Sequence, residues 1–369
     1  MCFSAQFCME RDMEPMTISK RILGWYARHQ RDLPWRRTRD PYAIWVSEIM
    51  LQQTRVDTVI PYYVLFMERF PVVQTLAEAS LEEVLKAWEN LGYYSRARHL
   101  HRASKEVVEV FSGKIPETRS ELLSLPGIGP YTAAAILSFA FEKNVAAMDA
   151  NVVRILCRIF AVQEPPQQAH TRKQLSHMAG NLVPEGDSSS YNQGLMDLGA
   201  TICTPRRPSC KTCPLNDLCE AYGRGLQEQL PVTVKGPPIP HREMTAGILT
   251  DNVGRVLVVR RPEEGFLGGL WKFPGGEKGR NETLTKALVN RILEETGLEV
   301  EVKKKVTSVR HAYTHFRITL HAFRCSLDVS QIQESDNPSL KWAPFSRLKD
   351  YPISKADRMI IEALYPAAL

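Results

Sequence analysis

The sequence has no long apolar run, and its N-terminus has no apolar stretch of the kind that a signal peptide requires. None of its 369 residues lies in an uninterrupted apolar segment of about 18 residues, the length needed to cross a bilayer. Glu10, Arg11, Asp12 and Glu14 stand where a signal peptide would have its apolar core. We therefore expect a cytoplasmic protein with no membrane partner.

The chain also lacks a strong charge excess, internal repeats and low-complexity tracts. Its formal net charge of +6 suits a polyanionic partner but is too common to identify one. With 44% hydrophobic and 24% charged residues, the composition excludes a disordered, fibrous or membrane-embedded protein. The length allows two domains, each with its own core.

The two halves of the sequence differ in their hydrophobic pattern. The first half has helical periodicity in segments such as 42–56, 81–95, 121–141 and 151–160, and the prolines of "LPVTVKGPPIPHRE" mark a linker. The second half alternates strand-like segments at 244–250, 254–261 and 315–325 with a helix at 282–297. The sequence therefore predicts a multidomain protein with an N-terminal extension, an all-α domain, a linker and an α+β domain, at residues 1–16, 17–225, 226–243 and 244–369.

Four of the eight cysteines form a tight group with the spacing Cys203-x6-Cys210-x2-Cys213-x5-Cys219. In a reducing compartment such a group is a set of metal ligands sooner than two disulfides. Four thiolates fit a tetrahedral zinc ion or an iron-sulfur cluster, and their chemistry alone does not distinguish the two. Three basic residues in the same loop suit contact with phosphates: Arg206, Arg207 and Lys211.

Glu48 lies in "WVSEIMLQQT", on a helix face that is otherwise mostly apolar. Burial of a carboxyl group raises its pKa, and a raised pKa lets it hold a proton near neutral pH and donate it as a general acid. A buried glutamate paired with an arginine or lysine is an equally good interpretation of the sequence alone.

Asp149 directly precedes the apolar-periodic segment "ANVVRILCRIF", which is the position of a helix N-cap. A carboxylate that accepts backbone N–H bonds at a helix start is expected to stay ionised. In that state it would stabilise a neighbouring positive charge.

Residues 17–225 resemble the MutY-type adenine-DNA glycosylases, which belong to the endonuclease III superfamily of helix-hairpin-helix proteins. The resemblance covers this half in order, in the segments "LPWRRTRDPYAIWVSEIMLQQTRVDTVIPYY", "AWENLGYYSRARHLH", "LPGIGPYTA", "MDANVVRILCR", "YNQGLMDLGATIC" and the four-cysteine loop. It implies a [4Fe-4S] cluster on the four cysteines. It also implies a monomeric, nucleoid-associated bacterial enzyme of base excision repair.

Members of this family flip adenine out of duplex DNA where it is mispaired with 8-oxoguanine or G, and hydrolyse its bond to deoxyribose. By resemblance, Glu48 would protonate adenine N7 and then activate water, and Asp149 would stabilise the oxocarbenium-like sugar or trap it covalently. Tyr131 and Asn151 would orient the reacting groups. The expected DNA and base contacts are Arg36, Leu51, Gln53, Tyr93 and Gln193, with Gln53 and Tyr93 as wedges in the base stack.

"LPGIGPYTAA" contains two glycines but lacks the third glycine of a G-x-G-x-x-G nucleotide loop. In the family it corresponds to the hairpin, where Gly127 and Gly129 would let a DNA phosphate approach the backbone N–H groups. Endonuclease III has a lysine at the position of Tyr131, and that amine opens a route to strand cleavage through a Schiff base. Tyrosine predicts a glycosylase that leaves the strand whole.

The second half resembles a Nudix domain, the module of MutT, which recognises 8-oxoguanine in MutY proteins. The box residues present are Gly276, Glu282, Ile292, Glu294, Glu295, Gly297 and Leu298, but the Arg-Glu pair of the box is replaced by Asn290-Arg291. The change removes a Mg²⁺ ligand and adds a cation, so we expect a binding domain without pyrophosphatase activity.

The segment Tyr313-Thr314-His315 falls where MutY proteins have a Phe-Ser-His loop that reads 8-oxoguanine, and it is expected to do the same. Two other functions remain open from the sequence. One is a nucleotide pyrophosphatase that uses the Nudix-like half, and the other is a lesion sensor without catalysis.

Overall fold

The structure is a computed structural model that describes residues 15–234, 237–328 and 337–364. Most of the predicted N-terminal extension, residues 1–14, lies outside this part. Contacts divide the chain into two compact units. The first runs to Thr75 and resumes over Arg102–Gly236, and the second contains Leu76–His101 and Pro237–Leu369. Each unit is described by itself.

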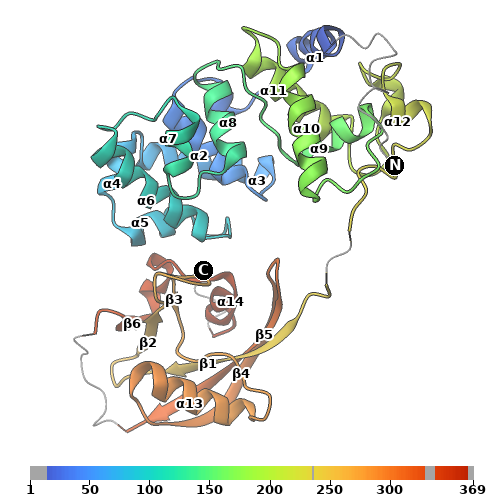
Figure 1. Cartoon of the computed structure of the whole chain (residues 1–369). Coiled ribbons are helices and arrows are strands. Elements are labelled where there is room, and N and C mark those ends of the chain that lie inside the picture. The colour runs from blue at the N-terminus through green and yellow to red at the C-terminus, as the bar shows by residue number, and fades with distance from the viewer. Residues whose placement is uncertain (1–14, 235–236, 329–336, 365–369) are drawn as a thin grey trace. The chain divides into compact units, whose positions relative to one another are not determined.

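From residue 15 to residue 234 all the regular elements of the described chain are helices, as the periodicity predicts (Figure 1). They are α1 (Pro15–His29), η2 (Pro34–Arg36), α2 (Pro41–Leu51), α3 (Val56–Arg69), α4 (Val73–Glu78), α5 (Leu81–Ala87), α6 (Ser95–Val110), α7 (Arg119–Ser124), α8 (Pro130–Phe139), α9 (Ala150–Ile159), α10 (Ala169–Leu182), α11 (Ser188–Thr201), η3 (Cys210–Thr212) and α12 (Glu220–Gly223). In the described residues, no helix is both long and apolar enough to span a bilayer.

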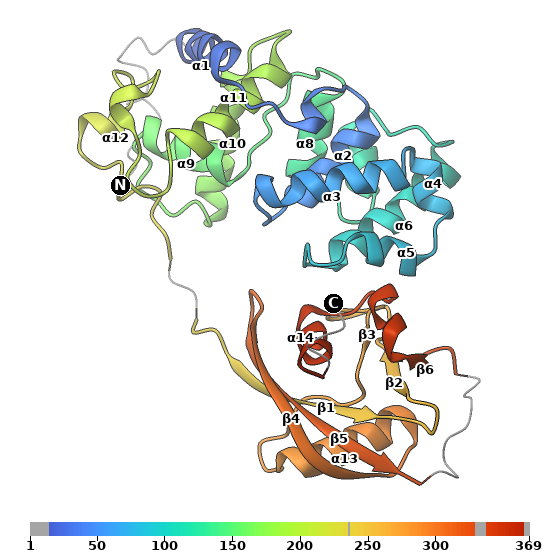
Figure 2. The same cartoon turned by 180° about the vertical axis from the view of Figure 1, so that it is seen from behind.

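Helices α2 and α8 pack side by side in the first unit, as both views show (Figures 1 and 2). Asp40 caps α2 by accepting from the N–H of Tyr42, and Pro41 occupies the first turn, where its missing N–H costs nothing. Ile44 of α2 and Ala135 of α8 belong to one apolar cluster. This packing places Glu48 of α2 opposite Tyr131 of α8.

Helices α9 and α11 pack with α1 and α10 around the larger core of this unit, which contains Ile155, Leu175 and Leu198. At Gly199 the backbone of α11 lies directly against α9. A Cβ atom added there would lie 2.5 Å from the Cβ of Asn151. The absence of a side chain at Gly199 therefore sets how closely Asn151 approaches α11.

The C-terminal part of the second unit contains two three-stranded sheets, with strand orders β1-β5-β4 and β3-β2-β6. Strands β1 and β5 are parallel, and the other pairs are antiparallel. The elements are β1 (His241–Leu249), β2 (Arg255–Arg260), β3 (Trp271–Lys272), α13 (Leu284–Thr296), β4 (Val300–Ala312), β5 (Arg317–Leu327), β6 (Leu340–Pro344), η5 (Phe345–Asp350) and α14 (Lys355–Leu364).

Helices α13 and α14 lie on opposite faces of the β1-β5-β4 sheet (Figures 1 and 2). Ile292 of α13 packs with Leu249 and Phe323, whereas Ile360 of α14 packs with Ile248 and Leu320. Successive strand residues point to opposite faces, so each strand supplies both cores. The α+β prediction for this half is confirmed.

Two features of this half differ from the sequence interpretation. Strand β1 begins at His241, within the expected linker, because His241–Glu243 continue the parallel pairing with Arg317–Thr319 of β5. Strand β4 was not predicted, because its central lysines, residues 303–305, are all exposed and break the alternation of apolar and polar residues. A register shift in its pairing with β5 occurs at the same place.

Candidate active site

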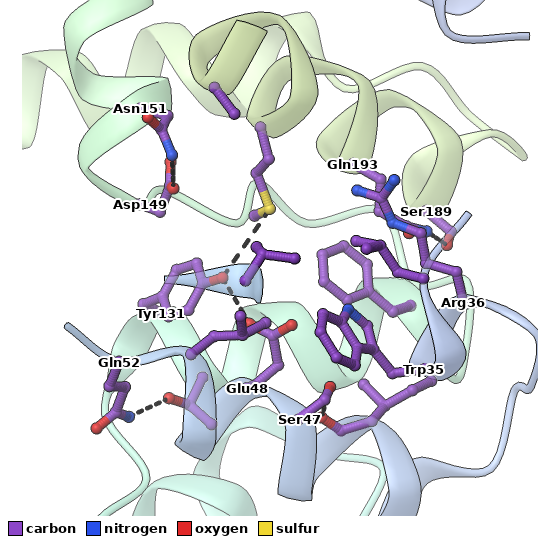
Figure 3. Close-up of a pocket in the computed structure, with 18 of the residues that line it drawn as sticks. Trp35, Arg36, Ser47, Glu48, Gln52, Tyr131, Asp149, Asn151, Ser189 and Gln193 are labelled. Carbon is purple, nitrogen blue, oxygen red and sulfur yellow. Dashed lines mark hydrogen bonds between the residues drawn. The ribbon is translucent and has the colours of Figure 1, made fainter. Parts of the chain in front are cut away.

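A pocket of about 910 Å³ in the first unit collects most of the predicted site residues (Figure 3). Its walls come from η2, α2, the α7–α8 turn, α8, α9 and α11. Ten of the residues expected to act on substrate or DNA line it: Arg36, Glu48, Leu51, Gln53, Gly127, Gly129, Tyr131, Asp149, Asn151 and Gln193. Of these ten residues, the two farthest apart in the sequence are Arg36 and Gln193, 157 positions from each other, and both line one cavity.

Glu48 is buried, with 4% of its surface exposed. The Tyr131 hydroxyl donates a hydrogen bond of 2.6 Å to Glu48 Oε2, so the partner of this carboxyl group is a phenol and not an arginine or lysine. Burial raises the pKa of Glu48 to about 7, against an ordinary value of 4.5. Asp149 also raises this pKa, while the Tyr131 hydrogen bond and Arg36 lower it. The expected raised pKa is confirmed.

Asp149 caps helix α9, as predicted. Its Oδ1 accepts from the backbone N–H of Val152 at 2.7 Å, and its Oδ2 accepts from the side-chain amide of Asn151 at 2.6 Å. The sequence predicted an ionised carboxylate, on the basis of backbone N–H bonds at a helix start alone. Burial outweighs them and raises the pKa of Asp149 above its ordinary value. The capping bonds therefore limit the rise in pKa and do not reverse it.

Tyr131 lies between the two carboxyl groups in the close-up (Figure 3). Burial and the charges of Glu48 and Asp149 raise the pKa of its phenol well above the ordinary value. The phenol therefore stays protonated and acts as a hydrogen-bond donor. It supplies no amine that could attack a sugar.

The glycine-containing turn forms the predicted connection between α7 and α8. Gly127 has φ +78°, a left-handed conformation that most other residues adopt only with strain. Gly129 is the N-cap of α8, and nothing lies within 4 Å of the position that a Cβ would take there. The backbone at this helix start is thus open to an approaching group.

The other predicted contacts in the first unit occupy two edges of the pocket. Gln193 donates from Nε2 to Ser189 Oγ at 2.9 Å and accepts from the Tyr26 hydroxyl at 3.4 Å. Gln53 is exposed beyond the end of α2 and has φ +58°. Strained backbone of this kind is common at functional sites.

An ion-pair group at the pocket wall was not predicted from the sequence. Asp197 of α11 is fully buried and is bound by the guanidinium groups of Arg31 and Arg36, and both arginines line the pocket. A signal existed, because Asp197 is a lone acid one turn beyond Gln193 in the otherwise uncharged helix "SSSYNQGLMDLGAT". The partners of Asp197 lie more than 160 residues away, which local patterns do not reveal.

The four clustered cysteines line one small cavity of about 30 Å³, together with Arg158. Arg206, Arg207 and Lys211 are exposed in the same loop. Burial raises the pKa of Cys210, Cys213 and Cys219, and the neighbouring cysteines contribute to each shift. In the described chain, no three His, Cys, Asp or Glu side chains are grouped so that they could hold a metal ion as they stand.

Two arginines of α9 bind the cysteine loop, and one of them, Arg154, also contacts the pocket residue Asn151. Arg154 donates to Asn151 Oδ1 at 2.8 Å and to the carbonyl of Cys203 at 2.9 Å. Arg158 is 2% exposed, and its Nη1 lies 3.3 Å from Cys203 Sγ and 2.7 Å from the carbonyl of Thr204. A guanidinium group directed at a sulfur atom suits a thiolate more than a thiol.

Four predicted DNA-contacting residues belong to the second unit. Tyr313 is half-buried and packs edge-on against Phe266, with ring centroids 4.7 Å apart. Thr314 and His315 are exposed at the tip of the β4–β5 hairpin, which the Tyr313 N–H closes onto the carbonyl of Phe316. Tyr93 has φ +48°, and its hydroxyl is hydrogen-bonded to that of Thr314.

The acidic residues of the Nudix-like box are bound by other groups of the same unit. Glu295 accepts two hydrogen bonds from the buried Lys272 ammonium, at 2.5 and 2.7 Å. Arg291 Nη1 lies 2.5 Å from Glu294 Oε2. Glu282 accepts from the N–H of Gly279 and from Asn290. Arg291 thus forms an ion pair with one of the carboxylates of the box.

The fold and the pocket define the class of protein. Residues 46–179 match the HhH-GPD superfamily of base excision DNA repair proteins, and residues 245–363 match the NUDIX domain. A thermostable thymine-DNA glycosylase of known structure is 34% identical, with a TM-score of 0.54, and the match covers 57% of this chain and 97% of that one. An endonuclease III–DNA complex, 20% identical with a TM-score of 0.51, has the same helical fold.

Relatives that match both halves narrow the class to one family. The adenine DNA glycosylase of Rattus norvegicus is 33% identical over 95% of this chain and 78% of its own length. The Homo sapiens enzyme is 34% identical over 95% of this chain and 74% of its own length. The enzyme of Buchnera aphidicola subsp. Schizaphis graminum is 32% identical over 94% of this chain and 99% of its own length. The chain belongs to the adenine DNA glycosylase family.

Proposed function

We propose that this chain is a monofunctional DNA glycosylase that excises adenine mispaired with 8-oxoguanine or G in duplex DNA, as a step of base excision repair. The observation that carries the proposal is the pocket in which a buried glutamate of pKa about 7 and a capped aspartate lie on either side of Tyr131. One carboxyl group is suited to hold a proton, and the other to carry a negative charge.

The proposed reaction uses these groups in turn. Glu48 donates its proton to N7 of the flipped adenine while the C1′–N9 bond breaks and the electron pair of that bond leaves with the base. Asp149 stabilises the positive charge that develops on the sugar, or traps C1′ covalently. The Glu48 carboxylate then takes a proton from water as its hydroxyl adds to C1′. The products are free adenine and an abasic site.

Tyr131 and Asn151 orient these groups. The Tyr131 hydroxyl holds Glu48, and the Asn151 amide holds Asp149. Because a phenol forms no Schiff base, we expect the abasic strand to stay intact until alkali is added. Tyr131→Lys would introduce an amine at this position, and borohydride should then trap a covalent protein–DNA complex that the wild-type protein does not form. Tyr131→Phe is the matched control and should form none.

We propose a [4Fe-4S] cluster on Cys203, Cys210, Cys213 and Cys219. The donor set fits, since four cysteine thiolates are the usual ligands of such a cluster and Arg158 directs a guanidinium group at Cys203. When bound, the cluster would brace the loop that exposes Arg206, Arg207 and Lys211 toward phosphates. Iron and sulfide analysis with visible absorption tests this, because a zinc protein would be colourless.

Recognition of the DNA is assigned to both domains, for which we propose the boundaries 17–225 and 244–369. The open backbone around Gly127 and Gly129 would bind a phosphate, and Gln53 and Tyr93 would fill the space left by the flipped base. The exposed hydroxyl and imidazole of Thr314 and His315, with the ring of Tyr313, would contact 8-oxoguanine. We expect the protein to act as a cytoplasmic, nucleoid-associated monomer.

A set of duplexes tests the substrate. Purified protein should release adenine from a duplex with A opposite 8-oxoguanine, and more slowly from one with A opposite G. Because one structural relative is a thymine-DNA glycosylase, a duplex with T opposite G should be included, together with thymine glycol opposite A. Adenine release from neither adenine duplex would rule out the proposed function.

The ion pairs of the Nudix-like box argue against a nucleotide pyrophosphatase as the second candidate. Lys272 and Arg291 occupy Glu295 and Glu294, which leaves these carboxylates poorly placed to bind Mg²⁺. Mg²⁺-dependent hydrolysis of 8-oxo-dGTP by the whole chain would support that candidate. A lesion sensor without catalysis would bind the mismatch and release no base.

A further inference from the structure

We propose that Asp197 is a positioning residue of this site, which holds Arg31 and Arg36 against the pocket wall and offsets part of their positive charge. The inference rests on the proposed function, because it assigns Asp197 a part in the same pocket. Asp197 itself does not line the pocket, whereas both arginines do.

The geometry is that of a carboxylate shared by two guanidinium groups. Arg36 binds it with both terminal nitrogens, Nη1 to Oδ2 at 2.7 Å and Nη2 to Oδ1 at 2.9 Å. Arg31 donates from Nε to Oδ1 at 2.6 Å and from its backbone N–H to Oδ2 at 3.1 Å. Bidentate contacts of this kind fix the planes of the groups as well as their separation.

Burial of these three charged groups has a large desolvation cost. The Asp197 side chain is 0% exposed, and that of Arg36 is 11% exposed. Burial alone would raise the pKa of Asp197, but the hydrogen bonds from Arg36 and Arg31 hold it below its ordinary value. Asp197 therefore stays ionised across the neutral pH range. Replacing such a group by an apolar one is often neutral for stability, so a buried ion pair is weak evidence of a purely structural role.

The charges around Glu48 explain what the ion pair does for the reaction. Arg36 faces Glu48 from η2, Asp149 faces it from the start of α9, and the Tyr131 phenol faces it from α8. Helix α11 contributes the uncharged Gln193 and Met196 to the same pocket. With Asp197 ionised, the two arginines and the aspartate carry one net positive charge. Without the negative charge of Asp197, the two arginines would carry two positive charges, and the larger positive charge would favour loss of the Glu48 proton.

Asp197→Asn tests the proposal through the pH dependence of single-turnover adenine release. Asparagine keeps the size of the side chain and removes its charge. We expect the alkaline limb of the profile, where Glu48 loses its proton, to move to lower pH by about half a unit or more. Asp197→Glu keeps the charge and should leave this limb where it is in the wild-type protein, even if the rate falls.

A second variant covers the case in which Asp197→Asn does not fold. Arg31 is at the edge of the group, with 30% of its side chain exposed, and Arg31→Gln removes one of the two positive charges. Its alkaline limb should move to higher pH, opposite to the shift expected for Asp197→Asn. A folded variant of either kind with an unchanged limb would overturn the proposal.

The same loop offers a matched control. Asp32 and Arg37 each follow one residue after Arg31 and Arg36 and form an aspartate–arginine ion pair of their own, but their side chains are 74% and 66% exposed. Asp32→Asn should leave the profile unchanged, because water screens this pair. Wild-type protein measured in parallel separates two failures. If wild-type protein releases no adenine, the proposed function is wrong. If it releases adenine but Asp197→Asn has the same alkaline limb as wild-type protein, only the role of Asp197 is wrong.

Discussion

The carboxyl groups of the helical pocket and those of the Nudix-like box are surrounded in opposite ways. In the pocket, Glu48 is buried against a phenol and Asp149 against amide N–H groups. In the box, Glu294 and Glu295 are each bound by a cation of the same unit, Arg291 and Lys272. The pKa values of Glu48 and Asp149 are raised, whereas Glu294 and Glu295 form ion pairs.

The difference shows why residue type alone does not identify a site. Desolvation that outweighs the nearby cations raises the pKa of a carboxyl group and makes it a proton donor near neutral pH. A directly bound ammonium or guanidinium group, as at Glu295 and Glu294, competes with a metal ion for the carboxylate oxygens. The box therefore keeps its acidic residues in the sequence, but the neighbouring cations engage the carboxylates that a metal ion would need.

The largest effect is expected from Glu48→Gln. Glutamine keeps the hydrogen bond from Tyr131 and has no proton of suitable acidity, so adenine release should fall by about 10²-fold to 10⁴-fold. The measurement is single-turnover release from a duplex with A opposite 8-oxoguanine. Glu294→Gln, the matched change in the Nudix-like box, should leave the rate within about twofold, since that acid is already neutralised by Arg291. Equal losses in the two variants would remove the contrast between the regions.

A smaller effect of the same variant is expected on stability, and its size depends on pH. The pKa of Glu48 is about 7 in the fold against 4.5 in an ordinary setting, so the folded state binds the proton more tightly. The stability that this proton provides is complete below about pH 4.5 and is lost as the pH rises through 7. Glutamine does not titrate. Glu48→Gln should therefore be more stable than wild-type protein at pH 8, by about 3 kcal/mol.

Urea unfolding at pH 5 and pH 8 measures this difference. The gain of the variant over wild-type protein should be present at pH 8 and nearly absent at pH 5. A gain of the same size at both pH values would mean that the Glu48 carboxyl group has no perturbed pKa in the fold.

The smallest effect is expected from restoring the Nudix box. Asn290→Arg with Arg291→Glu recreates its Arg-Glu pair, but Lys272 still binds Glu295. We expect no measurable hydrolysis of 8-oxo-dGTP and at most weak Mg²⁺ binding by calorimetry. Adding Lys272→Met should strengthen Mg²⁺ binding over the double variant, because it frees Glu295. Tight Mg²⁺ binding by wild-type protein would show that the ion pairs do not block the site.

Much of the fold was predictable because it follows from short-range patterns. Helices α2, α8 and α9, the turn at Gly127 and strands β1, β2 and β5 all have local signals of periodicity, capping or glycine. Strand β4 escaped prediction because its lysines hide the alternation, and its position is set by pairing with β5. Helix α14 also went unpredicted, although Ile360 and its neighbours complete one of the two cores.

The candidate site was predictable only where a residue had its own motif. Glu48, Asp149 and Tyr131 each stood out in the sequence, and the pocket that joins them is a property of the packing of α2, α8 and α9. Asp197 is a lone acid in its helix, but its role could not be predicted, because it comes from two arginines that precede it by about 160 residues. The raised pKa of Asp149 was missed for the same reason, since burial is set by the whole unit.

Gly199 shows how such a fold affects the interpretation of sequence variants. Its position against Asn151 leaves no room for even one methyl group. A change from glycine to alanine there would be classed by composition as a mild substitution in a buried helix, remote from every catalytic motif. Its first consequence would be to push the amide that holds Asp149. Variants at this residue therefore belong with those of the active site when natural sequences are sorted by their expected harm.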